Sequence, residues 1–250
     1  MRILLTNDDG IDSPGLHAVR EALEPHHETW ILAPDGERSA TSHYITIKDP
    51  IKCREIGERV LASDGSPADC VILALAGVLP DRPDVIISGI NIGPNLGTDI
   101  IYSGTVAAAR QAAIMGVPGI ALSVDGVRGT LHFEPLAEFI RDRLDDLLEL
   151  WNGEHFININ APNTPDRDKP VEVTSPAVRM YHDKLSEFRT PHGDVYFFMG
   201  GYPADPELVP GTDWYAVHHG AISVTPVMIN PVSHPAEEDY RKALYVDSTV

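Results

Sequence analysis

The sequence predicts an α/β fold in which a parallel β-sheet is covered by helices on both faces. From residue 2 to about residue 160, short apolar runs that end at Gly, Pro, Asn or Asp alternate with stretches of helical periodicity. Such alternation is typical of parallel strands joined by helices. Beyond Asn163 the helical periods thin out, and extended segments separated by Pro, Gly and Asp predict a hairpin or small sheet appended to this core.

Three strands and two helices are expected in the first half of the chain. The runs RILLT, TWILA and DVIIS are short and apolar, and each is followed by a turn-forming residue, as in buried strands. The two helices place apolar residues at intervals of three or four along one face. The strands are expected at residues 2–6, 29–33 and 84–88, and the helices at 14–23 and 69–78.

The alternation of strands and helices continues in the second half of the chain and then ends. A helix at about 105–115 stops at Gly116, a common C-terminal signal. We expect one domain over residues 1–250, with the α/β core at about 1–165 and a hairpin arm, C-terminal strands and a helix at about 166–250. The remaining elements are expected as strands at 119–124 and 155–160, helices at about 134–150 and 235–245, and extended segments at 170–178, 194–199 and 213–226.

Composition restricts the partners of the protein. The 250 residues are 43% hydrophobic, which is enough for one sizeable core. Nineteen Lys and Arg against thirty-seven Asp and Glu give a formal charge of −18. A surface of that sign repels polyanions, so a nucleic-acid polymer and an anionic membrane are both poor candidates. A small phosphorylated substrate is compatible with this charge if a bound cation reverses the field locally.

Cysteine usage and hydropathy predict a soluble, cytoplasmic protein. Cys53 and Cys70 are the only cysteines and form no CxxC pair, which favours a reducing compartment over a disulfide framework. The apolar run at residues 3–5 is too short for a signal peptide, and no later run is long enough to span a bilayer.

The acidic turn Asn7–Gly10 follows the first expected strand. Taken alone, it is an ordinary turn. In open parallel sheets, however, ligands bind at the carboxyl ends of the strands. The adjacent carboxylates of Asp8 and Asp9 repel each other unless a cation lies beside them, and oxygen ligands suit Mg²⁺ or Mn²⁺. The pair is therefore a candidate metal site.

Two further loops follow the second and third expected strands. The loop APDGERSAT contains Ser39, which in isolation is better explained as a turn cap. The loop SGINIGPNLGTD has glycines at 89, 93 and 97, a spacing that matches neither the dinucleotide fingerprint nor the P-loop. A loop so rich in Gly and Asn allows backbone and amide oxygens to approach a ligand closely.

The motif Tyr102-Ser103-Gly104-Thr105 opens the helix expected at 105–115. Free N–H groups and the helix dipole favour a phosphate at such a position, and the hydroxyls add hydrogen bonds. An ordinary N-cap, which every helix needs, is the alternative explanation. Four polar or Gly-rich loops at neighbouring strand ends and helix starts nevertheless predict a phosphate site more strongly than any one of them.

Four segments, in this order along the chain, resemble the signatures of the SurE (stationary-phase survival) nucleotidases: MRILLTNDDGIDSPGL, APDGERSA, SGINIGPNLGTDIIYSGTVAAA and ISVTP. The resemblance extends at least from Met1 to Pro226. It implies a Rossmann-like α/β core with a protruding C-terminal hairpin and a metal-dependent 5′/3′-nucleotidase activity. It also implies a homodimer or homotetramer formed through the hairpin, here at about residues 171–200.

The resemblance further implies a metal-ligand set. The family holds its divalent cation with the two aspartates of NDDG, the serine after APD and the asparagine of SGIN. These positions are Asp8, Asp9, Ser39 and Asn91 in this chain. Family members often carry asparagine or arginine where this chain has Gly36 and Glu37, and this departure leaves the base preference open.

Together these features predict a phosphomonoesterase that hydrolyses nucleoside 5′- and 3′-monophosphates, with short polyphosphate as a further candidate substrate. One Mg²⁺ or Mn²⁺ per subunit acts as a Lewis acid, and Asp8 or Asp9 orients or deprotonates the attacking water. The residues expected to hold the phosphoryl oxygens are Asn95, Ser103, Gly104 and Thr105.

Two other functions are compatible with an acidic turn after the first strand. A haloacid-dehalogenase-type phosphatase is disfavoured, because its second aspartate lies two residues after the first, where this chain has Gly10. A nucleotide-binding sensor or scaffold without turnover remains open.

Overall fold

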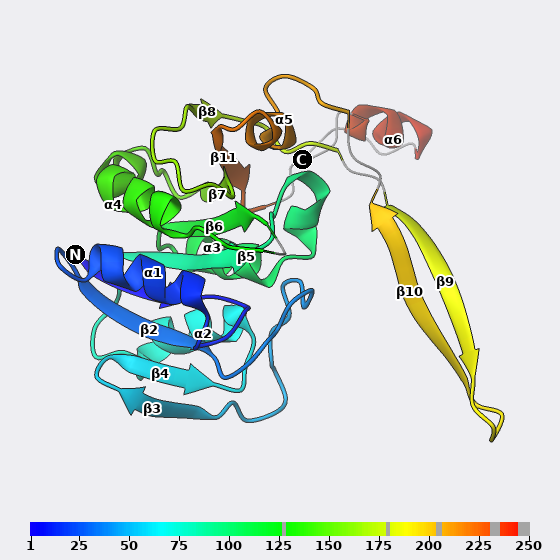
Figure 1. Cartoon of the computed structure of the whole chain (residues 1–250), viewed down its shortest axis with the longest axis horizontal. Coiled ribbons are helices and arrows are strands. Elements are labelled where there is room, and N and C mark those ends of the chain that lie inside the picture. The colour runs from blue at the N-terminus through cyan, green and yellow to red at the C-terminus, as the bar shows by residue number, and fades with distance from the viewer. Residues whose placement is uncertain (127–128, 179–180, 204–206, 231–235, 245–250) are drawn as a thin grey trace.

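The computed structural model of the chain describes residues 1–126, 129–178, 181–203, 207–230 and 236–244. A nine-stranded sheet in the order β3-β4-β2-β1-β5-β6-β7-β11-β8 forms the main body, and a separate two-stranded sheet, β9-β10, projects from it (Figure 1). The predicted α/β fold with an appended hairpin is confirmed.

The five expected strands form the centre of the main sheet. They are parallel and nearly fully buried, as expected of apolar runs covered on both faces. These strands are β1 (Arg2–Thr6), β2 (Glu28–Pro34), β5 (Val85–Ile92), β6 (Gly119–Asp125) and β7 (His155–Pro162).

Helices cover both faces of this sheet. On one face, α1 (Pro14–Leu23) and α4 (Glu134–Glu149) pack against alternate strand residues such as Ile3 and Leu5. On the other face, α2 (Pro67–Leu73) and α3 (Gly104–Ile114) pack against the residues in between, such as Leu4. This division follows from the two-residue period of a strand, which sends successive side chains to opposite faces.

One edge of the sheet was not anticipated from the sequence. There, β4 (Val60–Ser63) runs parallel to β2, and β3 (Cys53–Gly57) pairs with β4 in antiparallel fashion. Most of β3 is exposed and its sequence CREIG lacks an apolar run, so hydrophobic patterning could not reveal it. The helix expected at 69–78 consists of α2 and a following π-helical segment, η1 (Ala74–Val78).

The C-terminal part corrects one expectation. The segment 213–226 is not extended throughout, because α5 (Asp213–His218) is a helix whose N-cap Thr212 accepts a hydrogen bond from the Tyr215 N–H. Six residues are too few to show helical periodicity, which explains the error. The strands β8 (Val171–Val173) and β11 (Ile222–Met228) then extend the main sheet beside β7.

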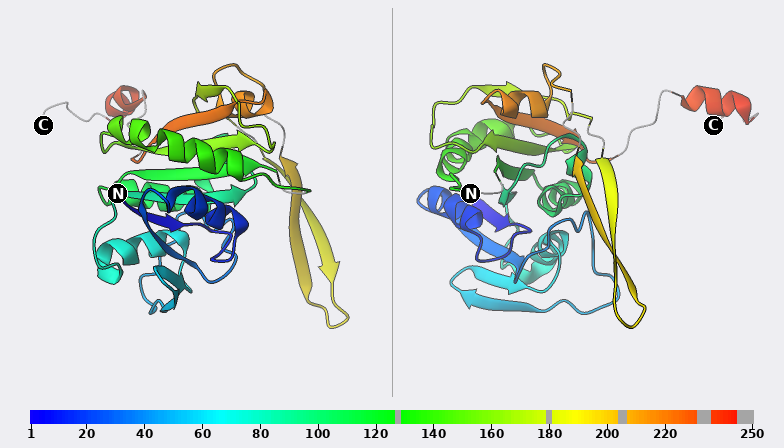
Figure 2. Two further views of the ribbon diagram at one scale, coloured as in Figure 1. Left: turned by 60° about the vertical axis from the view of Figure 1, so that its left-hand side comes forward. Right: turned by 45° about the vertical axis from the view of Figure 1, so that its right-hand side comes forward.

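The hairpin consists of β9 (Tyr181–Arg189) and β10 (Val195–Pro203), and it stands away from the main body (Figures 1 and 2). The last helix, α6 (Glu237–Ala243), falls within the expected range of 235–245, whose two end positions lie outside the described residues. Among the helices of the described part, none has both the length and the apolar character needed to cross a membrane.

Asp213 joins three segments of the chain beside the Gly-rich loop. Its fully buried carboxylate accepts hydrogen bonds from the N–H groups of Gly97 (2.7 Å), Ala177 (2.9 Å) and Trp214 (2.8 Å). Burial raises the pKa of this carboxyl, while the hydrogen bonds oppose the shift. Because Gly97 begins the 3₁₀ turn η2 (Gly97–Ile101) that leads into α3, Asp213 positions the approach to that helix.

We expect Asp213→Ala to lower the free energy of unfolding by about 3–5 kcal/mol, because it leaves three buried N–H groups without an acceptor. Thermal and urea unfolding at one protein concentration would measure the loss. Asp49→Ala, in an exposed loop, is the matched control. Equal stability of the Asp213 variant and the control would contradict the anchoring role.

Candidate functional site

The carboxyl ends of three neighbouring strands bring most of the predicted site residues to one edge of the sheet. Because β1 lies between β2 and β5 and is parallel to both, these three strands end side by side. Asp8 and Asp9 follow β1, Ser39 lies in the loop after β2, and Asn91 lies near the end of β5. The register of β5 against β6 shifts between Ser88 and Asn91.

The turn after β1 is held by its own side chains. The Asn7 amide nitrogen donates a hydrogen bond to the Gly10 carbonyl (2.8 Å), and the Asn7 side-chain oxygen accepts one from the Gly10 N–H (3.2 Å). Gly10 has φ +101°, and a Cβ there would lie 3.1 Å from the carbonyl carbon of Gly36. Glycine therefore allows the turn to lie against the loop after β2.

Asp8 lies buried at the start of α3. The Thr105 hydroxyl donates a hydrogen bond to Asp8 Oδ1. A Cβ on Gly104 would lie 2.9 Å from Asp8 Oδ2, so this glycine lets the helix start approach the carboxylate. Since the N-terminus of a helix favours negative charge, α3 stabilises the ionised form of Asp8.

The other three predicted ligands are attached to the same edge through backbone contacts. The Ile92 N–H donates to Asp9 Oδ2 at 3.1 Å, which places Asp9 beside the end of β5. The Asn91 side-chain nitrogen donates to the Gly93 carbonyl (2.8 Å), so its amide oxygen is the atom suited to a cation. The Arg38 N–H donates to the Asp8 carbonyl (2.7 Å) and so holds the loop that carries Ser39.

The electrostatics of the acidic pair favour a cation. Burial raises the pKa of Asp8 despite the hydrogen bond from Thr105. Burial, followed by repulsion from Asp8, raises the pKa of Asp9 from its ordinary value of 3.8 to about 7. The Glu37 carboxylate raises both pKa values further. A divalent cation beside the pair would offset all three effects.

The donor atoms fit such a cation. Two carboxylates, an amide oxygen and a hydroxyl oxygen form an all-oxygen set, which suits Mg²⁺ or Mn²⁺. Within the described ranges, no group of three or more His, Cys, Asp or Glu side chains is arranged so that it could hold a metal ion. The candidate set therefore depends on combining the two acidic residues with the neutral oxygens of Ser39 and Asn91.

The predicted phosphate-binding residues occupy different positions. Ser103 is the N-cap of α3, and its hydroxyl oxygen accepts a hydrogen bond from the Val106 N–H (3.1 Å). Gly104 and Thr105 form the first turn of the helix and contact Asp8. The Thr105 hydroxyl donates its hydrogen bond to Asp8, so it is not free to donate to a phosphate in this arrangement.

Asn95 belongs to a buried polar network that the sequence reasoning missed. Its N–H donates to Asn160 Oδ1 (2.8 Å), its side-chain nitrogen donates to Ser123 Oγ (2.8 Å), and its carbonyl accepts from Asn158 (2.8 Å). Asn95 thus fixes the Gly-rich loop to β6 and β7. The available signal was the pair of asparagines at alternate positions in the otherwise apolar strand HFININ.

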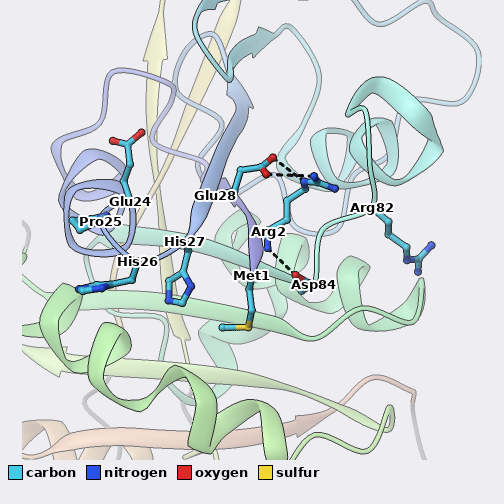
Figure 3. A pocket seen from close by; sticks show the side chains of 9 residues that line it. All are labelled: Met1, Arg2, Glu24, Pro25, His26, His27, Glu28, Arg82 and Asp84. Atoms are coloured by element: carbon cyan, nitrogen blue, oxygen red, sulfur yellow. Dashed lines mark hydrogen bonds and ion pairs between the residues drawn. The ribbon is translucent and has the colours of Figure 1, made fainter.

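A cleft of about 250 Å³ lies beside the acidic pair, with Asp9, Ser13, Asp35, Glu37 and Ile92 in its lining. A larger hollow of about 560 Å³ lies at the opposite, amino-terminal ends of the strands (Figure 3). There, Arg2 pairs with Glu28 (2.9 Å) and its backbone N–H donates to Asp84 (2.7 Å), so opposite charges compensate each other. The smaller cleft is the better candidate for chemistry.

Comparison with known proteins identifies relatives over almost the whole chain. A family model described as "Survival protein SurE" matches residues 3–183. A protein named 5′-nucleotidase SurE from Desulforudis audaxviator is 44% identical over an alignment of 252 positions that covers 97% of this chain and 97% of its own. A protein of the same name from Geotalea daltonii is 39% identical over 92% of this chain and 94% of its own. The crystal structure of the SurE protein from Aquifex aeolicus has a TM-score of 0.84 and 34% identity, covering 98% of this chain and 100% of that one.

The raised pKa of Asp9 predicts how the metal-free protein responds to pH. Its carboxyl binds a proton more tightly in the folded than in the unfolded chain. The associated stability is therefore present below about pH 4 and is lost as pH rises to about 7. In the presence of a chelator, the melting temperature of the protein should fall over this window, and that of Asp9→Asn should fall less. If the melting temperatures of the two proteins fell in parallel as pH rises, the raised pKa of Asp9 would be contradicted.

Proposed function

Because the chain belongs to the SurE family, we propose that it is a 5′-nucleotidase that hydrolyses nucleoside monophosphates to nucleoside and orthophosphate. One observation carries the proposal: the buried carboxylate of Asp8, next to the partly buried Asp9, meets the N-terminus of α3 at the carboxyl edge of the sheet, in a chain 44% identical to a protein named 5′-nucleotidase SurE. Activity on 3′-monophosphates and on short polyphosphate is a further part of the proposal.

The metal site is also part of the proposal. Asp8, Asp9, Ser39 and Asn91 would hold one Mg²⁺ or Mn²⁺ per subunit, which supplies Lewis acidity toward the phosphoryl group. The support is the all-oxygen donor set and the repulsion from Glu37, which raises the pKa values of Asp8 and Asp9 in addition to burial.

In the proposed reaction, residues of the chain have separate roles. Thr105 and the start of α3 hold Asp8 in one orientation. Asp9 borders the cleft and accepts the proton of the attacking water. The N–H groups at the start of α3 and the Ser103 hydroxyl stabilise the phosphoryl oxygens as negative charge builds on them. The water oxygen forms a bond to phosphorus, the ester P–O bond breaks, and the departing nucleoside oxygen takes up a proton.

Phosphate release from adenosine and guanosine monophosphates, with and without chelator, tests this function. We expect Mg²⁺ or Mn²⁺ to restore activity after chelation, and Asp8→Asn to lower kcat at saturating metal by about 100-fold or more. Asp49→Asn, in an exposed loop, should behave as the wild type. Nucleotide binding without phosphate release would favour the sensor alternative, and near-wild-type turnover by Asp8→Asn would overturn the site assignment.

The hairpin supports a homodimer or homotetramer. Residues directly opposite each other on β9 and β10 share a face of the hairpin. One face carries Leu185 and Met199 together with Phe197, and the other carries Phe188 and Tyr196. All five side chains are more than half exposed. A two-stranded hairpin is marginal by itself in water, so a second copy of the chain is the proposed cover.

We expect the combined changes Leu185→Ser, Phe197→Ser and Met199→Ser to weaken self-association, because they remove the apolar side chains of one face. Size-exclusion chromatography with light scattering would measure the mass. The control combines Lys184→Ser and Glu187→Ser on the same hairpin. An unchanged mass for the triple variant would contradict assembly through this face.

Two organisational proposals complete the description. We propose that residues 1–250 form a single domain, which is supported by β8 and β11 joining the same sheet as the N-terminal strands. We also propose a cytoplasmic location, with which the free thiols of Cys53 and Cys70 agree.

A further inference from the structure

Glu37 is a third acidic residue at the candidate metal site and is not one of the four proposed ligands. It lies in the exposed loop after β2 and lines the cleft together with Asp9. The neighbouring Arg38 holds this loop in place: its N–H donates to the Asp8 carbonyl (2.7 Å) and its guanidinium donates to Asp35 (3.0 Å). Glu37 and Ser39 therefore flank a backbone position that is fixed to Asp8.

The contact between these two residues determines how Ser39 can act. The Ser39 hydroxyl donates its hydrogen bond to Glu37 Oε1. A hydroxyl has one proton and two lone pairs, and it can ligate a cation only through a lone pair. Because Glu37 accepts the hydrogen bond that the Ser39 hydroxyl donates, both lone pairs of the Ser39 oxygen remain available for a cation. Carboxylates that orient ligand groups in this way are common around protein metal sites.

The charge of Glu37 acts in the same direction. Its carboxylate raises the pKa values of Asp8 and Asp9, so its field reaches both. In the part of the chain that the structure describes, no Lys, Arg or His forms an ion pair with Glu37, whereas Arg38 pairs with Asp35 (3.0 Å). A carboxylate without an ion pair that lines the same cleft as Asp9 attracts a cation held by the acidic pair.

We propose that Glu37 is a positioning residue that orients the Ser39 hydroxyl as a cation ligand and strengthens cation binding by its charge. The inference rests on the proposed metal site, which it extends by one residue. It assigns two separable effects to Glu37: acceptance of a hydrogen bond, which needs Ser39, and negative charge, which does not.

Two substitutions separate these effects. Glu37→Gln removes the charge but keeps an acceptor for the Ser39 hydroxyl, whereas Glu37→Ala removes both. Each is made in the wild-type chain and in a Ser39→Ala background. Glu55→Gln and Glu55→Ala, on the exposed strand β3, are the matched controls.

The readout is Mn²⁺ binding to chelator-treated protein, measured by electron paramagnetic resonance of the free ion and by calorimetry. We expect Glu37→Ala to raise the Kd for Mn²⁺ about tenfold and Glu37→Gln to raise it less. In the Ser39→Ala background the two substitutions should have equal effects, because only the charge remains to be lost. Wild-type Mn²⁺ affinity in Glu37→Ala, or the same difference between Gln and Ala with and without Ser39, would overturn the proposal.

The binding measurement also keeps this inference apart from the proposed function. Wild-type protein that binds Mn²⁺ but releases no phosphate would refute the nucleotidase activity alone. Metal-dependent phosphate release together with unchanged Mn²⁺ affinity in Glu37→Ala would refute the role of Glu37 alone.

Discussion

Burial of the Asp8 carboxylate at the end of β1 is the constraint on which the arrangement of the site depends. A carboxylate removed from water is costly unless other groups replace its hydration. The Thr105 hydroxyl and the start of α3 do so in part, and they can reach Asp8 because residue 104 is glycine. The turn after β1, the first turn of α3 and the loop after β2 are thereby held together around one charged group.

Asp9 and Glu37 make the local field still more negative, in a chain that already carries a formal charge of −18. A phosphorylated substrate would be repelled from such a surface. A divalent cation at the acidic pair, as proposed, would resolve this conflict, because it would offset the repulsion among the carboxylates and provide positive charge for a phosphate. The helix start at Ser103 adds backbone N–H groups on the same side.

Hydrophobic patterning was a reliable guide where strands are buried on both faces. The short apolar segments RILLT and HFININ are typical of buried strands, and both form inner strands of the sheet, β1 and β7. Hydrophobic patterning did not predict β3, because the exposed sequence CREIG has no periodic signal. It also did not predict α5, because this helix is shorter than two turns. In each case tertiary contacts, which a local window does not contain, determine the conformation.

The sequence by itself determined the fold class, the family and the positions of the polar loops at the strand ends, since these follow from local patterns and motif spacing. Only the tertiary structure decided which side chains meet. Thr105 lies against Asp8, Asn95 bonds to β6 and β7, and Asp213 reaches back to Gly97. These partners are 28 to 116 residues apart in the chain. Their contacts arise from strand order and helix packing, so no local pattern could reveal them.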